Sequence, residues 1–236
     1  MRSSYGLQRG IPSLVVFAAI SALLLLNSCP SHGQRKDNPA AYACDSKTFN
    51  LQDAGNDGAT LASPNKRKQL IFDEHADFSV LQGKKRIGRI SLSHVSCCIE
   101  AGWAPDSLQF FVMSSGGGGV GEYYVRAFRI EEDKIAELSA PKKVAADFKK
   151  NHSCESRSNN LFVLGWTPDS AKIFLVPEVY PTGDCKQLGL FRGYLMDAKT
   201  DAIVSIFGEK ETDQIKKLSR DAHVVVLPHD SSPHTP

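Results

Sequence analysis

The chain has 236 residues, of which 42% are apolar, 23% are charged and 8% are aromatic, and its formal net charge is +2. This length suits one domain or two small, closely packed repeats, and the apolar content is sufficient to build a core. The near-neutral charge argues against a nucleic-acid-binding protein, so the basic clusters Lys66–Lys68 and Lys84–Arg86 are expected to be solvated faces.

Residues 1–33 are typical of a bacterial export signal. Two arginines precede an apolar run from Ile11 to Leu26, which is shorter than a membrane-spanning helix. The sequence Leu26-Asn27-Ser28-Cys29 resembles the lipobox of bacterial lipoproteins, which implies lipidation of Cys29, while small residues shortly after it offer an ordinary cleavage site. Both alternatives predict an exported protein, either periplasmic or held at a membrane through Cys29.

The cysteines bear on the same compartment. Six are present, and either processing route removes Cys29 from the residues that can pair. An oxidising compartment then favours up to two disulfides among the other five, and the first choice is Cys154 with Cys185. No Cys-x-x-Cys pair occurs, which argues against a redox or zinc site of that type. We expect no metal and no cofactor.

Three further segments are set by composition. Residues 34–68 are rich in Asn, Asp, Pro, Ser and Ala, and they are predicted to form a flexible or loosely packed arm. Residues 69–227 are predicted to form a β-repeat domain, and residues 228–236 a disordered tail. At the start of the domain, Asp77 to Gln82 and Arg86 to Leu92 are predicted to form a hairpin, which corresponds to half of a repeat unit.

One motif occurs twice. Gly102-Trp103-x-Pro105-Asp106-Ser107 and Gly165-Trp166-x-Pro168-Asp169-Ser170 are each followed by an apolar run. Proline fixes φ at the corner of a turn, and Asp and Ser can hydrogen-bond the backbone amides of that turn. The motif residues Trp103, Pro105, Asp106, Ser107, Trp166, Pro168, Asp169 and Ser170 are therefore expected to be structural rather than catalytic.

The repeat extends beyond the motif. Units of about 94–150 and 160–218 each predict four strands followed by a short amphipathic helix. Within them, Val125–Phe128 aligns with Phe191–Tyr194. A last apolar run, His223–Leu227, could pair with the first half unit and close the sheet system.

The two motif copies resemble the PD40, or TolB-type, β-propeller repeat over about a dozen residues each. The resemblance implies four-stranded antiparallel blades with the motif in the turn between the first two strands, and a surface used for protein contacts. The 63-residue spacing, which is the difference between Trp166 and Trp103, exceeds the usual blade length, and two units are too few to close a ring. We expect a mostly β fold of antiparallel four-stranded units, incomplete and propeller-like or stacked, with short helices after each unit.

No catalytic motif accompanies the repeat. Gly-x-Ser-x-Gly and His-Glu-x-x-His are both absent. We therefore expect a non-catalytic module that binds another exported or envelope protein through the loops Ser114–Gly121 and Pro177–Gln187, with no nucleic-acid partner and with membrane contact only through Cys29. The alternatives are a periplasmic inhibitor or immunity protein and, third, a secreted hydrolase with Asp73, Glu74 and His75 as its acid-base cluster.

Overall fold

Three four-stranded antiparallel sheets make up most of the computed structural model, which describes residues 60–72, 77–92, 99–115, 122–152, 159–180, 186–219, 225 and 227. Blade 1 contains β1 (Thr60–Ala62), β2 (Lys68–Phe72), β3 (Asp77–Gln82) and β4 (Lys85–Ser91). Blade 2 contains β5 (Ile99–Trp103), β6 (Gln109–Ser115), β7 (Tyr123–Glu131) and β8 (Lys134–Glu137). Blade 3 contains β9 (Asn160–Trp166), β10 (Lys172–Glu178), β11 (Gly193–Asp197) and β12 (Ile203–Phe207). The expected fold class is confirmed.

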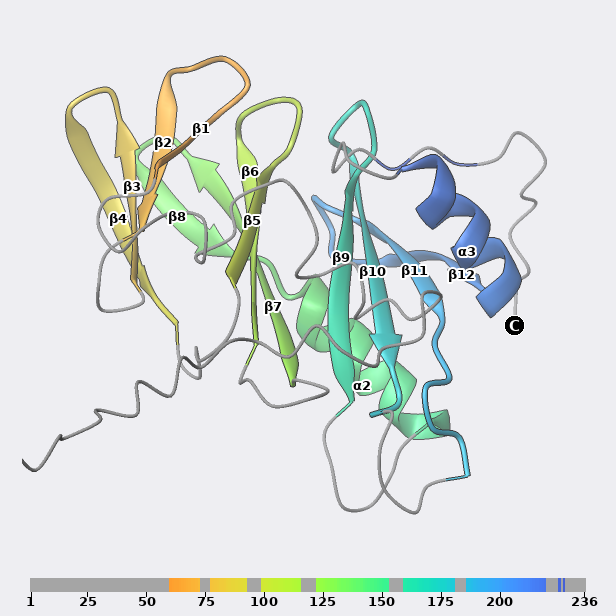
Figure 1. The fold of residues 1–236 in the computed structure, drawn as a ribbon. Coiled ribbons are helices and arrows are strands. Elements are labelled where there is room, and N and C mark those ends of the chain that lie inside the picture. The colour runs from red at the N-terminus through yellow and green to blue at the C-terminus, as the bar shows by residue number, and fades with distance from the viewer. Residues whose placement is uncertain are drawn as a thin grey trace, which may run out of the picture.

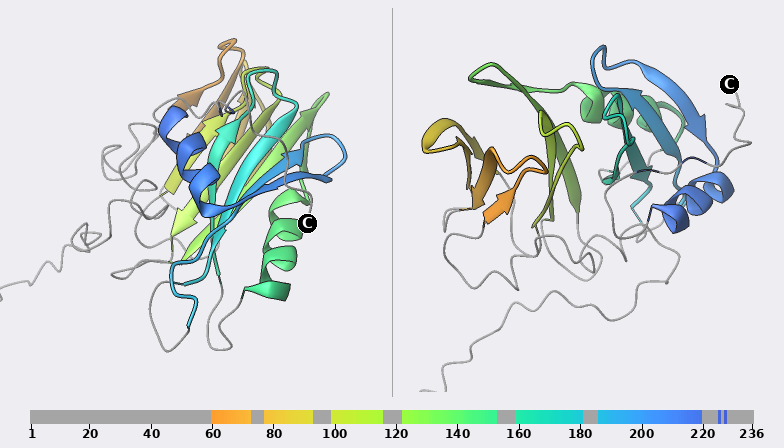
Figure 2. Two further views of the ribbon diagram at one scale, coloured as in Figure 1. Left: turned by 90° about the vertical axis from the view of Figure 1, so that its right-hand side faces the viewer. Right: turned by 90° about the horizontal axis from the view of Figure 1, so that it is seen from above.

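Within each blade the strands pair in chain order, so every connection is a hairpin. The blades follow one another side by side (Figure 1), and from above they trace an open arc (Figure 2). The described strands do not close into a ring. The chain is thus a short run of repeats, in which each blade packs on its neighbours in sequence.

Two hydrophobic clusters hold the blades together. The side chains of β6 alternate between them: Phe110 and Val112 face blade 1, whereas Phe111 and Met113 face blade 3. All four are at most 3% exposed. A strand that is buried on both faces has a continuous apolar sequence, which explains the apolar run that follows the first motif.

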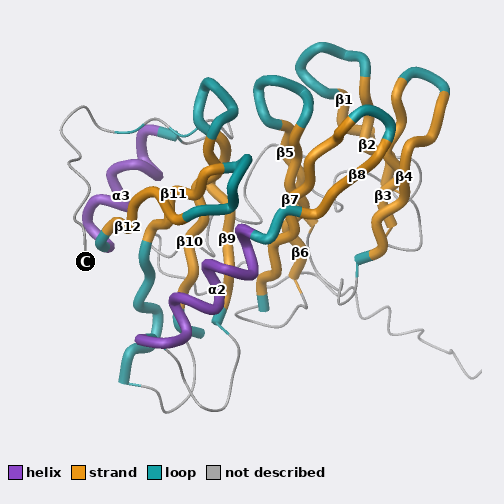
Figure 3. Tube along the Cα trace, turned by 180° about the vertical axis from the view of Figure 1, so that it is seen from behind, coloured by secondary structure: helices purple, strands orange, loops and turns teal. Residues whose placement is uncertain are grey.

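Helix α2 (Ala140–Asn151) follows blade 2 and inserts its apolar side between blades 2 and 3 (Figure 3). Val144 and Phe148 are fully buried there. At its start, Asp201 of the β11–β12 turn accepts hydrogen bonds from the backbone and hydroxyl of Ser139 at 3.0 and 2.7 Å. The helix therefore joins the second unit to the third. No helix in the described ranges is long and apolar enough to cross a membrane.

Helix α3 (Glu209–Leu218) covers the face of blade 3 that points away from blade 2 (Figure 2). Its buried residues Thr212 and Ile215 are fully covered, and Ile215 belongs to the same cluster as Phe174 and Phe207 of blade 3. Gly193 on β11 lets the helix approach, since a Cβ there would lie 2.6 Å from Thr212 Oγ1. The helix takes the position that a fourth blade would occupy.

Three expectations need correction. The hairpin Asp77–Leu92 is the outer half of a complete blade, because β1 and β2 complete it and β1 lies inside the stretch 34–68 that composition assigned to an arm. The backbone N–H of Val225 donates to Trp166 O at 2.7 Å, so this described residue of the last apolar run bonds to blade 3 and not to blade 1. Blade 3 is the nearer partner for a segment that comes soon after α3.

The alignment of the third strands is displaced by two residues. Arg126 pairs with Val112, and the position equivalent to Val112 in blade 3 is Leu175, whose partner is Tyr194. Val125–Phe128 therefore corresponds to Gly193–Met196 and not to Phe191–Tyr194. A shift of two keeps every side chain on the same face, so hydrophobic pattern alone cannot detect it.

Candidate functional site

The repeated motif forms the turn between the first two strands of its blade. Ser107 N donates to Ala104 O at 3.0 Å, and Ser170 N donates to Thr167 O at 2.8 Å. The aspartate of each turn accepts a hydrogen bond from the backbone two residues later. Asp106 Oδ1 accepts from Leu108 N at 2.8 Å, and Asp169 Oδ1 accepts from Ala171 N at 3.0 Å. Both copies thus form the same hydrogen-bonded turn.

A third turn of the same form lies in blade 1, at Ser63-Pro64-Asn65-Lys66. Lys66 N donates to Ser63 O at 2.8 Å, and Asn65 Oδ1 accepts from Arg67 N at 3.0 Å. Lys66, Ser107 and Ser170 all have a left-handed φ, of 60°, 63° and 60°. The sequence pattern did not reveal this copy because Ala62 stands where the others have tryptophan, and only Pro64 and Asn65 indicated it.

The motif serines also join each blade to the one before it. Ser107 Oγ accepts from Asn65 N of blade 1 at 3.0 Å, and Ser170 Oγ accepts from Asp106 N of blade 2 at 2.9 Å. The carbonyls of the same serines accept from Lys68 Nζ at 3.2 Å and from Gln109 Nε2 at 3.0 Å. This pair of bonds repeats at both joints, so the motif sets the spacing between blades.

The motif tryptophans are buried in the joints as well. Trp103 is 7% exposed, lies 5.1 Å from Phe110 between ring centroids, and donates Nε1–H to Leu61 O of blade 1 at 3.1 Å. Trp166 is fully buried. Burying an indole contributes on the order of 2 kcal/mol or more. The prolines, Pro105 and Pro168, stay at the surface of their turns, at least partly exposed.

Asp169 shows the electrostatics of this turn. The Thr167 hydroxyl donates to Asp169 Oδ1 at 2.6 Å, and this bond, followed by the bond from Ala171 N, lowers the pKa of the Asp169 carboxyl. A carboxylate that accepts bonds from its own turn is held as an anion and is poorly suited to proton transfer. The group stabilises the turn.

The opposite end of blades 2 and 3 holds a buried polar chain. Asn160 Oδ1 accepts from Tyr123 N of β7 at 3.2 Å, and Asn160 Nδ2 donates to Glu178 Oε2 at 3.1 Å. Glu178 is fully buried, and this burial raises its pKa to about 7, while Asn160 and then Lys216 oppose the shift. Within the described ranges Glu178 Oε1 accepts no hydrogen bond. The chain bridges two blades.

This buried chain lies at the base of the two loops that were expected to bind a partner. Residues 116–121 and 181–185, which form most of those loops, are outside the described residues, as are Cys29, Cys154, Cys185 and the cluster Asp73, Glu74 and His75. Among the residues that are described, no three His, Cys, Asp or Glu side chains gather as a metal site would require.

A groove of about 600 Å³ separates the outer strands of blades 1 and 2. Arg126 occupies its wall, donating to Glu137 Oε2 at 2.7 Å and to Ser91 O at 2.8 Å, with its guanidinium 5.0 Å from the centre of the Phe128 ring. The bond from Arg126 lowers the pKa of Glu137. These charges neutralise each other, so the groove presents no free charged group from Arg126 or Glu137.

The outer edge strands differ sharply between blades. β4 has the sequence Lys-Arg-Ile-Gly-Arg-Ile-Ser, and β8 has Lys-Ile-Ala-Glu, so both carry charges. β12 has Ile-Val-Ser-Ile-Phe and carries none. Its Ile203 and Val204 are 39% and 44% exposed. Among the described strands β12 pairs only with β11, which leaves its other edge open.

Comparisons with known proteins give limited likenesses. No family model matches the chain, and no curated protein matches it. Solved structures similar over 63%, 62% and 63% of the chain include the Cps50 (Swd1) β-propeller domain of Myceliophteria thermophila, a putative TolB from Agrobacterium tumefaciens and the acylaminoacyl peptidase of Pyrococcus horikoshii, at 16%, 13% and 10% identity. The TM-scores are 0.36, 0.30 and 0.29, and the chain spans only 41%, 44% and 22% of those proteins. The fold is therefore defined by the three blades of this chain.

Proposed function

We propose that this chain is an exported, non-catalytic module that binds another protein along the outer edge of blade 3. The observation that carries the proposal is the sequence of β12, which lacks the charged side chains present on β4 and β8. Soluble proteins protect the edges of their sheets with Lys, Pro or short strands, because an open edge offers unpaired N–H and C=O groups to any extended chain. Blade 3 leaves that edge unprotected.

The occupant of this edge is an extended segment of another exported protein, which adds a fifth strand to blade 3. Backbone hydrogen bonds would supply affinity, and side chains that alternate along the added strand would meet the exposed Ile203 and Val204. Because β12 carries no charge, the segment it selects is uncharged and rich in β-branched residues. A second copy of this chain is the competing occupant, and the experiment separates the two.

The test begins with a photo-crosslinking amino acid at Ile203 of the full chain in its native host, which identifies the neighbour by mass spectrometry. The identified protein is then purified and titrated against the unmodified chain, Val204→Lys and Leu108→Lys. Leu108 is 46% exposed in the β5–β6 turn, so it matches Val204 in exposure but lies away from the edge.

We expect Val204→Lys to weaken binding at least about tenfold, because a lysine facing the added strand must be desolvated, and Leu108→Lys to leave binding unchanged. Equal affinity of all three proteins would overturn the edge as the binding surface. A sedimentation experiment on the chain alone gives a monomer if the partner is a different protein. A dimer that Val204→Lys dissociates would assign the edge to a second copy instead.

The export part of the proposal has its own measurement. The intact mass of the protein from its native host, before and after reduction and alkylation, gives the first residue, any lipid on Cys29 and the number of disulfides. A chain that begins at Cys29 with added acyl groups places the module on a membrane. A chain that begins near Gln34 without lipid makes it soluble, and a chain that begins at Met1 contradicts export.

A further inference from the structure

Blade 1 carries a basic surface that the sequence divides into two separate clusters. Lys66 and Arg67 lie in the β1–β2 turn, and Lys84 and Arg86 lie at the β3–β4 turn. The two turns are neighbours, because Gly83 N donates to Arg67 O at 3.0 Å and Lys68 pairs with Gln82 across β2 and β3. Clusters separated along the chain thus meet at one end of blade 1, which we call the basic end.

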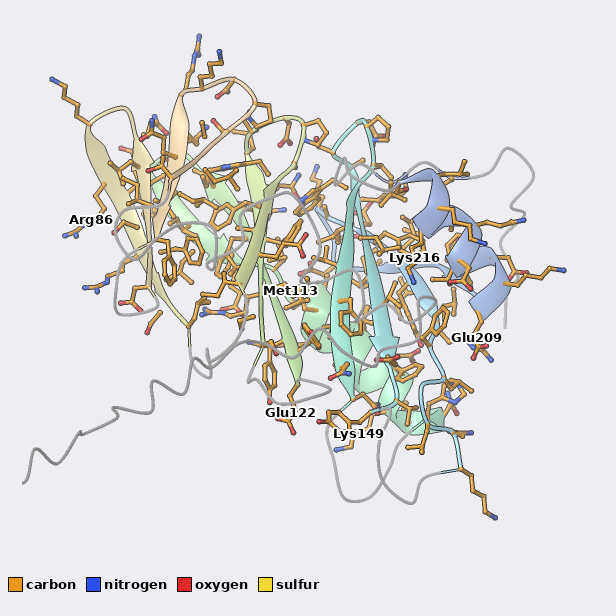
Figure 4. All side chains as sticks on the ribbon, viewed as in Figure 1. Arg86, Met113, Glu122, Lys149, Glu209 and Lys216 are labelled. Carbon is orange, nitrogen blue, oxygen red and sulfur yellow. The ribbon has the colours of Figure 1, made fainter. Side chains whose placement is uncertain are left out.

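The four side chains of the basic end are exposed. Within the described ranges none of them has an acidic partner, whereas the two other nearby cations do: Lys85 binds Asp133 of blade 2, and Arg89 binds Asp77 at 2.6 Å. Arg86 points outward from blade 1 (Figure 4). Four unneutralised cations at the tips of two adjacent turns give this end a positive field.

The equivalent turns of the other blades have the opposite charge. In blade 2 the first turn carries Asp106, and the turn from β7 to β8 carries Glu132 and Asp133 beside Lys134. In blade 3 the first turn carries Asp169, and the β11–β12 turn carries Asp197, Lys199 and Asp201. The backbone of the first turn is the same in all three blades, so its change in charge is not required by the fold.

The joint between blades explains why position 66 can hold a lysine. Ser107 and Ser170 sit at the equivalent left-handed position because their hydroxyls accept a bond from the preceding blade. No described blade precedes blade 1, so position 66 has no such bond to make. A lysine there keeps the turn, with its 2.8 Å bond to Ser63 O, and places an ammonium group at the surface.

We propose that the basic end binds the anionic headgroups of a lipid bilayer, which orients the blades on the membrane. The proposal rests on the export of the chain in the proposed function, and a lipid on Cys29 would hold blade 1 near the membrane. Clusters of four to eight Lys and Arg near a membrane anchor are attracted to anionic lipid. Blade 1 is the first described blade after Cys29, and Thr60 lies 31 positions after Cys29 in the sequence.

Chain length permits this contact. A stretch of that many residues spans at most about 100 Å, so an anchor on Cys29 keeps blade 1 within reach of the same bilayer. A phosphate plane also fits the position of the charges, which stand at turn tips rather than in a pocket. An exported protein does not meet the nucleic acids of the cell interior, which would otherwise compete as polyanions. The two turns also contain no aromatic residue on which a base could stack.

The first experiment is a lysine-acetylation footprint of the full exported chain, read by mass spectrometry. It compares vesicles of phosphatidylcholine with vesicles that contain about 30% phosphatidylglycerol. We expect Lys66 and Lys84 to be protected about fivefold or more only in the anionic vesicles, and to lose that protection in about 0.5 M salt. Exposed Lys149 and Lys210, on α2 and α3, should be modified equally in both.

The second experiment uses two charge-matched variants. One replaces Lys66, Arg67, Lys84 and Arg86 with Glu, and the control replaces Lys149, Lys186, Lys199 and Lys210 with Glu, which are exposed and lie elsewhere. Both change the net charge equally. We expect the first to lower partitioning into anionic vesicles at least about 100-fold, and the control to lower it much less.

Three results would overturn the proposal: equal protection in neutral and anionic vesicles, equal losses in the two variants, or protection of Lys66 and Lys84 by inorganic phosphate alone at matched ionic strength. The third would assign the basic end to free phosphate. Circular dichroism confirms that both variants are folded. A chain that begins at Met1 in the intact mass, or partner binding that Val204→Lys leaves unchanged, would instead count against the proposed function and leave the footprint result standing.

Discussion

Blade 1 and blade 3 stand at opposite ends of the same stack, and their outward faces are built differently. On blade 3, α3 presses Thr212 and Ile215 onto the sheet, and Val225 extends the contact along β9. On blade 1, Gln69 and Ile71 alternate with the buried Leu70 and Phe72 and remain half-buried. A helix covers the outward face of blade 3, whereas the outward face of blade 1 is formed by its own strands. The two ends of the described stack therefore differ in what packs on the outermost sheet.

A carboxylate placed on each outward face gives the largest expected contrast between the two ends. Ile215→Asp puts a charge into a fully buried site, so we expect unfolding to become easier by about 4 kcal/mol. Ile71→Asp, on the half-buried face of blade 1, should cost about 1 kcal/mol. Urea denaturation followed by tryptophan fluorescence measures both, and Gln214→Asp on the exposed side of α3 is the control. Equal losses at Ile215 and Ile71 would show that α3 is not a cap.

Glu178 provides a test in pH. Its pKa in the folded protein is about 7, above the value of 4.5 for the free side chain, so the folded state binds the proton more tightly. The contribution of Glu178 to the free energy of unfolding is therefore fully present below pH 4.5. It is lost as the pH rises through about 7, by as much as about 3 kcal/mol.

Glu178→Gln keeps the bond from Asn160 and removes the ionisable group, so we expect it to abolish that fall and to stabilise the protein above pH 7. Denaturation midpoints between about pH 5 and about pH 8 give the comparison. Glu131→Gln, on an exposed side chain at the end of β7, is the control. Parallel pH profiles for the unmodified protein and Glu178→Gln would contradict the burial of the charge.

Substitutions at two glycines compare the contact of α3 with blade 3 and the contact between blades 1 and 2. A methyl group at Gly193 would meet Phe174 Cζ and Thr212 Oγ1 at 2.6 Å, and both neighbours are fully buried, so Gly193→Ala should cost about 2 kcal/mol. At Gly88 it would meet only Ile135, nearest at the end of its flexible side chain, and Gly88→Ala should cost less than about 1 kcal/mol. Thermal denaturation ranks them. The reverse order would place the tighter contact at blade 1.

The smallest effects come from the turns. Ser107→Ala and Ser170→Ala each remove the acceptor of a bond between blades, so each should cost about 1 kcal/mol. Lys66→Ser restores the motif residue where no described blade precedes it, and it should change stability by less than about 0.5 kcal/mol. Urea midpoints resolve this difference. A stabilising Lys66→Ser would mean that blade 1 has a neighbour which accepts or donates at that position.

Sequence patterns were most accurate where the cause was local. The apolar run after each motif predicted β6 and β10, the amphipathic end of each unit predicted a helix, and Pro-Asp-Ser predicted two turns. They failed at blade 1, where Ala62 and Lys66 replace the two residues that mark the motif. In the other blades, the Trp and Ser of the motif contact the preceding blade. No described strand precedes blade 1, so its sequence does not need these two residues and the motif is not recognisable there. The Glu178 chain was also undetectable, because Asn160 and Tyr123 come from different units.

Residues close together in the chain were enough to predict the repeat, the antiparallel hairpins and the turns of the tryptophan motif, because each depends on local contacts. The three-dimensional arrangement was needed to see that α3 and Val225 pack on blade 3, that Lys66 and Arg67 stand beside Lys84 and Arg86, and that β12 is the uncharged strand among the three outer edges. These features depend on which faces of the sheets and helices pack together, and those elements are far apart in the sequence. The burial of apolar side chains determines this packing, and no local sequence pattern encodes it.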